Sequence, residues 1–76
     1  LNNPSDGASV SYKLNFLPLV DDHMKIIDNL GSIVFMRKGM FLQNDELIFD
    51  DRLTRGLYIV NYYTENEILQ SRLLVK

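Results

Sequence analysis

The stretch that decides the fold is residues 57–76, LYIVNYYTENEILQSRLLVK, in which two apolar runs flank the polar tetrapeptide TENE. The first run is rich in β-branched and aromatic residues, which favour strands. The second run alternates as a half-buried strand does, and one of its faces carries Leu69, Ser71, Leu73 and Val75. We therefore expect two long strands joined by a hairpin turn at residues 64–67.

Residues 8–16, ASVSYKLNF, show a strict alternation nearer the N-terminus. The buried face of this expected strand would carry Val10, Tyr12, Leu14 and Phe16. Pro18 cannot donate to a strand ladder, and the adjacent Asp21 and Asp22 favour turns. A loop is expected to follow the strand there.

Residues 23–41 have the pattern of a second hairpin. Its reversal is expected at Asn29, Leu30 and Gly31, where glycine can adopt a positive φ. The side chains expected to face the core from its two arms are Met24, Ile26, Val34 and Met36. Gly39 would end the second arm, a short strand is expected around residues 47–49, and residues 50–56 would form another loop.

These elements predict an all-β fold, an antiparallel Ig-like β-sandwich of about six to seven short strands. A chain of 76 residues is long enough for one domain. We assign this domain to residues 8–76. Residues 1–7 are interpreted as a linker or a residual edge strand that follows a cleavage region.

Composition argues against several classes of function. Eight basic and ten acidic side chains give a net charge of −2 without a block of either sign, so nucleic-acid binding is not expected. No apolar run approaches the roughly 20 residues that span a bilayer. The first residues, LNNPSDG, show neither an initiator methionine nor an export signal, so we expect the chain to be a piece of a longer protein.

Candidate catalytic and metal-binding residues are few. The chain has no cysteine, and its one histidine, His23, has no nucleophile near it in the sequence. Asp21, Asp22 and His23 could be read as metal ligands, but three consecutive residues rarely converge on one ion. We interpret them, like the pair Asp50 and Asp51, as solvated loop residues. A domain without enzymatic activity, metal or cofactor is expected.

Four short motifs occur in order along the chain: NPSDG at residues 3–7, IIDNLGSIV at 26–34, RGLYIV at 55–60 and RLLVK at 72–76. Together they resemble the type A C-terminal sorting domain of the type IX secretion system of Bacteroidota. That family's pattern runs from Asn-Pro and a glycine, through a hairpin and a Gly-x-Tyr strand, to a last apolar strand ending in lysine. The residues that match its structural motifs are Asn3, Pro4, Gly7, Asp28 and Gly31.

The resemblance covers essentially the whole chain, with two departures. The strand usually found before Asn-Pro is reduced to Leu1, which suggests a cleavage boundary just upstream. Asn29, Ser32 and Asp51 replace residue types that are more usual in the family. The chain is also similar to Ig-like modules related to the C-terminal domain of the flagellar hook-capping protein. An accessory, adhesion or spacer module of a secreted bacterial protein is therefore the alternative function.

The sorting-domain resemblance implies that the domain is fused to the C-terminus of a cargo protein. In the periplasm, an outer-membrane receptor or shuttle of the type IX system would recognise the domain and move the cargo to the cell surface or the medium. A sortase-like cysteine peptidase would then cut near Leu1 and could attach the cargo to anionic lipopolysaccharide. The domain would thus be the substrate of an enzyme.

The residues expected to serve recognition by the secretion machinery are Gly56, Tyr58, Leu73, Leu74, Val75 and Lys76. A last strand over residues 69–76 could be read by strand addition or through Lys76, and its edge could also pair with a second copy. Leu73 and Val75 have an equally good interpretation as core positions, whereas Leu74 lies on the polar face. Tyr58 and Tyr62 are expected to pack their rings and keep their hydroxyls in water. A sugar-stacking surface at Tyr62 or Tyr63 is a further alternative.

Overall fold

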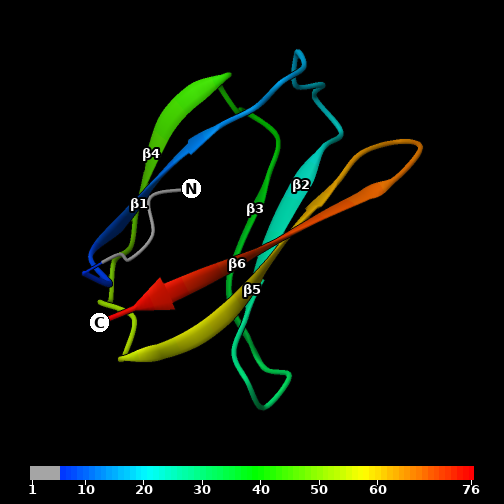
Figure 1. Cartoon of the computed structure of the whole chain (residues 1–76). Helices are drawn as coiled ribbons and strands as arrows, with labels where there is room; N and C mark the ends of the chain where they lie inside the picture. Colours follow the sequence, from blue (N-terminus) through cyan, green and yellow to red (C-terminus); the bar gives the residue numbers. More distant parts are fainter. Residues whose placement is uncertain (1–5) are drawn as a thin grey trace.

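The computed structural model describes residues 6–76 and contains six strands in two sheets (Figure 1). The strands are β1 (Ser9–Lys13), β2 (His23–Ile27), β3 (Ile33–Lys38), β4 (Asn44–Ile48), β5 (Gly56–Tyr63) and β6 (Ile68–Val75). The larger sheet has the order β3-β2-β5-β6, the smaller sheet pairs β1 with β4, and every pairing is antiparallel. The prediction of an all-β, antiparallel sandwich is therefore confirmed.

The hairpin of β5 and β6 forms where the sequence predicts it. Its ladder runs from Gly56 opposite Val75 to Tyr63 opposite Ile68. The turn is closed by the Thr64 amide, which donates to the Glu67 carbonyl at 2.9 Å. The Thr64 hydroxyl oxygen also accepts the Glu67 amide at 3.1 Å, as serine and threonine commonly do in turns. Because β2 pairs with the other side of β5, β6 lies at the edge of the larger sheet.

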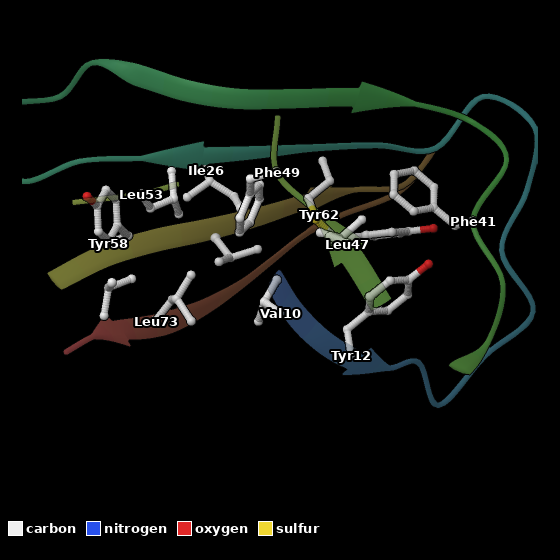
Figure 2. Packing of buried hydrophobic residues seen from close by; sticks show 13 residues of the cluster. Val10, Tyr12, Ile26, Phe41, Leu47, Phe49, Leu53, Tyr58, Tyr62 and Leu73 are labelled. Carbon is white, nitrogen blue, oxygen red and sulfur yellow. The ribbon is translucent and has the colours of Figure 1, made fainter. Parts of the chain in front are cut away.

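The core lies between the two sheets (Figure 2). Its buried hydrophobic residues are Val10, Tyr12, Met24, Ile26, Phe41, Leu47, Phe49, Leu53, Tyr58, Val60, Tyr62, Leu73 and Val75. Aromatic rings fill one end of it, where Tyr62 meets Phe16 and Phe41 edge to face with centroids 5.6 and 5.1 Å apart. Leu14 and Phe16 are partly buried against this cluster, so the predicted inward face of the first strand is correct.

The inward face predicted for β3 is wrong. Val34 is 40% exposed and Met36 is 63% exposed, while Phe35 packs edge to face against Phe49 with centroids 5.2 Å apart. The register sets the face: Phe35 pairs with the buried Ile26 and Arg37 with the buried Met24, so Met36 between them faces outward. A β-bulge follows, because Ile27 pairs with Ile33 and leaves Val34 as the extra residue. The run of four apolar residues has no alternation, so the sequence contains no signal for which face is buried.

The interpretation of Asp22 as a solvated loop residue is also wrong. Its side chain is 2% exposed, and one carboxylate oxygen accepts hydrogen bonds from the Leu19 amide at 2.9 Å and the Tyr62 hydroxyl at 2.8 Å. The Asp22 carbonyl accepts the Gly39 amide at 2.7 Å. The carboxylate thus fixes the loop between β1 and β2 onto the sheet. The Tyr62 hydroxyl, which we expected in water, is the buried donor in this contact.

Candidate functional site

The residues expected to serve recognition gather at one end of the β5–β6 ladder. Gly56 pairs with Val75, and two positions further along Tyr58 pairs with Leu73. Leu74 lies between these pairs on β6, and Lys76 follows the strand at an exposed position. The structure therefore brings together residues that are up to twenty positions apart in the sequence.

Three of these residues face inward and stabilise the core. Leu73 is fully buried, Val75 is 1% exposed and Tyr58 is 5% exposed. The Tyr58 hydroxyl donates to the Thr54 carbonyl at 2.6 Å, so its polar end is held by the protein. Of the two interpretations of Leu73 and Val75, the structure supports core positions. These side chains set the register of β6 and are covered in the folded domain.

Leu74 faces outward, as the alternation of the strand predicts. It is 40% exposed and lies opposite Leu57, which is 49% exposed. Leu57 was not singled out from the sequence, because an apolar residue in an apolar strand carries no signal for its face. The outward surface at this end of the sheet thus presents a pair of leucines across two strands.

The family-motif residues that the structure describes lie at the same end of the sandwich. Gly7 has a φ of 87° and is buried, and a Cβ at this position would overlap the Leu53 carbonyl oxygen and press on the Val75 side chain. Gly7 therefore fits under the end of β6 because it lacks a side chain. Asn3 and Pro4 lie outside the described residues.

Asp28 and Gly31 shape the turn between β2 and β3. One Asp28 carboxylate oxygen accepts the Leu30 and Ser32 amides, each at 2.9 Å, and Gly31 has a φ of 87°. Since Ile27 pairs with Ile59 on β5, this turn lies at the end of the sheet where β5 begins (Figure 1). Gly56, the first residue of β5, has a φ of 154°. The described motif residues Gly7, Asp28, Gly31 and Gly56 therefore lie toward one end of the molecule.

A hollow opens along the first half of β6, on the side that faces the smaller sheet. It has a volume of about 200 Å³, and its lining includes Tyr12, Leu14 and Phe16 on one side and Leu69, Gln70 and Ser71 on the other. The Tyr12 hydroxyl is buried without a hydrogen-bond partner among the described residues. Burial raises the pKa of this hydroxyl. The hollow lies between β1 and the edge strand β6. No residue type in the sequence predicts a hollow of this kind.

The structure separates the acidic and histidine residues that could be read as metal ligands. Asp22 points into the core, while His23 stacks its ring on Tyr63 with centroids 4.4 Å apart and planes 6° from parallel. Within residues 6–76, no three or more His, Asp or Glu side chains are grouped as a metal site requires.

Tyr62 is buried and thus cannot stack on a sugar, so the sugar-stacking alternative is wrong for Tyr62. The described part of the chain contains no helix that is long and apolar enough to cross a membrane.

Comparisons with known proteins add no relative. No family model, curated protein sequence or solved structure matches the chain.

Proposed function

We propose that this domain is a C-terminal sorting domain that directs an attached cargo protein through the type IX secretion system. The observation that carries the proposal is the position of β6: it forms an edge of the four-stranded sheet, and a hollow opens along its first half. An edge strand offers backbone donors and acceptors in a fixed register. A receptor strand could therefore add to residues 68–71 of β6 without unfolding the domain.

The hollow next to β6 could receive side chains of an added strand, in addition to the backbone hydrogen bonds. An added strand along residues 68–71 would lie next to Leu69 and Ser71 and could place a side chain between them and Leu14. Alternate side chains of an added strand point to opposite faces, so one of each pair would enter the hollow. The hollow gives the interaction side-chain specificity, while Leu73 and Val75 hold β6 in register from below.

The motif resemblance supports the proposal through the geometry of its residues. Gly7 and Gly31 adopt a positive φ, and Asp28 closes the turn that contains Gly31. Each motif residue in the described part of the chain thus has a structural reason for its identity, and Gly7 packs against the end of β6. The exposed residues of the last motif that a receptor could touch are Arg72, Leu74 and Lys76.

In this function the domain is recognised and cut by other proteins. Its partners are the N-terminally fused cargo, an outer-membrane receptor or shuttle, and the sortase-like cysteine peptidase that removes the domain near Leu1. The domain passes through the periplasm and reaches the cell surface or the medium. It performs no chemistry itself, and attachment of the cargo to lipopolysaccharide is the work of the peptidase.

The test is the export of a fluorescent protein that carries residues 1–76 at its C-terminus and a periplasmic export signal at its N-terminus. It is expressed in two strains of a bacterium, one with and one without a working type IX system. Fluorescence outside the cells of the first strain alone is the expected result, and mass spectrometry of the product locates the cut.

Retention of a folded fusion in the periplasm of both strains would reject the proposal. That result would favour the alternative function, an Ig-like accessory or adhesion module. Circular dichroism and limited proteolysis of the purified fusion establish that the domain is folded in the retained material.

A further inference from the structure

The outer face of the larger sheet differs in charge from the rest of the molecule. All ten acidic residues of the chain lie outside β2, β3, β5 and β6, although the net charge of the protein is −2. The same strands contain Lys25 and Lys38, which point outward from the sheet. This face is therefore locally cationic on an acidic protein.

The two lysines line a shallow hollow together with His23 and Met36. His23 lies opposite Lys38, and Lys25 lies opposite Met36, so the four side chains form two adjacent rows that line it. Tyr63 orders one side of this group, because its ring stacks on His23 and lies 5.2 Å from the Lys25 ammonium nitrogen. Among residues 6–76, no carboxylate lies within salt-bridge distance of Lys25 or Lys38.

Apolar side chains extend the same face on both sides of the hollow. Met36 is 63% exposed, Ile33 is 54% exposed and Ile68 is 60% exposed. Their pairings with Lys25, Ile27 and Tyr63 place them on the outward side of the sheet. Scattered exposed apolar residues are normal, but a set gathered on one sheet face marks an interaction surface.

We propose that this face docks an acidic protein segment that also carries apolar side chains. The carboxylates of such a segment would pair with Lys25 and Lys38, and its apolar side chains would cover Met36 and Ile33. The face supplies local charge complementarity, whereas the protein as a whole is negative and would be repelled by an anionic membrane at long range. Apart from Ile68, the residues of this docking surface lie on β2, β3 and β5, and the proposal does not depend on the secretion function.

The experiment is an NMR titration of the isotope-labelled chain with three synthetic peptides, each about eight residues long to match a strand. The first alternates glutamate and leucine, the second alternates lysine and leucine, and the third alternates glutamate and serine. We expect the glutamate–leucine peptide to bind tightest and to shift the amide signals of β2, β3 and β5. Reversal of charge by Lys25→Glu or Lys38→Glu should weaken this binding by about tenfold.

The matched control is Lys13→Glu, which reverses an exposed lysine at the end of β1 on the other sheet. It should leave the affinity unchanged. The proposal is overturned if the lysine–leucine peptide binds as well, if Lys13→Glu weakens binding as much, or if the shifted signals lie on β1 and β4. The proposal is also overturned if none of the three peptides binds and the face instead binds anionic vesicles or a second copy of the chain.

Discussion

Gly7 and Gly31 share a φ of 87° but differ in their surroundings. A Cβ at Gly31 would meet no atom within 4 Å, whereas a Cβ at Gly7 would overlap the Leu53 carbonyl oxygen. A side chain would therefore strain the backbone at both Gly7 and Gly31, but it would overlap a neighbouring atom only at Gly7. The Gly7 carbonyl also accepts the Leu53 amide at 2.8 Å, so a shift of the backbone would weaken that bond.

The two glycine-to-alanine variants should separate strain from overlap. Gly31→Ala should lower the free energy of unfolding by about 1 kcal/mol, the cost of a side chain at positive φ. Gly7→Ala should lower it by clearly more, about 2 kcal/mol or above, because Leu53 and Val75 must also move. Urea unfolding followed by circular dichroism measures both values. Equal losses would mean that Gly7 is not packed as described.

The buried contact between Tyr62 and Asp22 makes stability depend on alkaline pH. Burial, and next the hydrogen bond to the Asp22 carboxylate, raise the pKa of Tyr62. Tyrosine in the unfolded chain titrates near pH 10, so above that pH the folded state holds the proton that the unfolded state loses. The contribution of Tyr62 to stability is therefore complete below about pH 10 and decreases above it.

Urea midpoints measured from neutral pH to about pH 11 should fall above pH 10, with a slope of up to about 1.4 kcal/mol per pH unit from Tyr62. The variant Tyr62→Phe is less stable at neutral pH by about 1–3 kcal/mol, because Asp22 loses a buried donor. Its stability should fall less steeply above pH 10 than that of the wild type. Parallel pH profiles for the two proteins would contradict the role assigned to this hydroxyl.

At the scale of the elements, β6 has two faces with different tasks. Leu73 is fully buried, and its neighbour Leu74 is 40% exposed on the opposite face. Removal of a buried leucine side chain costs its transfer free energy and leaves a cavity, whereas removal of a half-exposed one costs little. The period of two expected for this strand, with Leu69, Ser71, Leu73 and Val75 on one face, places Leu73 inward and Leu74 outward, as observed.

Leu73→Ala should lower the free energy of unfolding by about 2–5 kcal/mol, and Leu74→Ala by less than about 1 kcal/mol. The comparison is matched in residue type, strand and substitution. Denaturant unfolding of the full chain measures both values. A large loss for Leu74→Ala would show that the outward face of β6 is covered by another part of the protein.

Elements with clear alternation were predictable, and elements without it were not. Residues 8–13 and 68–75 showed their buried faces in the sequence, and the turn residues Gly31 and Thr64 marked the two hairpins. The face of β3 was not predictable, because IVFM is apolar throughout and a bulge at Val34 changes its phase. Asp22 was missed because its partner Tyr62 is 40 positions away in the sequence.

For the molecule as a whole, the sheet order determines which features become surfaces. The order β3-β2-β5-β6 places β6 at an edge beside the hollow. It also gathers the lysines of β2 and β3 on the outer face. Sequence motifs predicted the residues at the end of β6, but the hollow and the charge separation depend on pairings between distant strands. The two surfaces are distinct, so variants of one should leave the other intact.

Two serine variants test whether the secretion machinery recognises the edge of β6. Ser71→Lys places a charge in the hollow beside this edge, where it should block an added strand, and Ser32→Lys places the same charge in the exposed turn between β2 and β3. Both are compared with the wild type as fluorescent-protein fusions in a strain with a working type IX system. We predict that the Ser71→Lys fusion stays folded in the periplasm while the Ser32→Lys fusion is exported normally; equal export of the two folded fusions would contradict the claim.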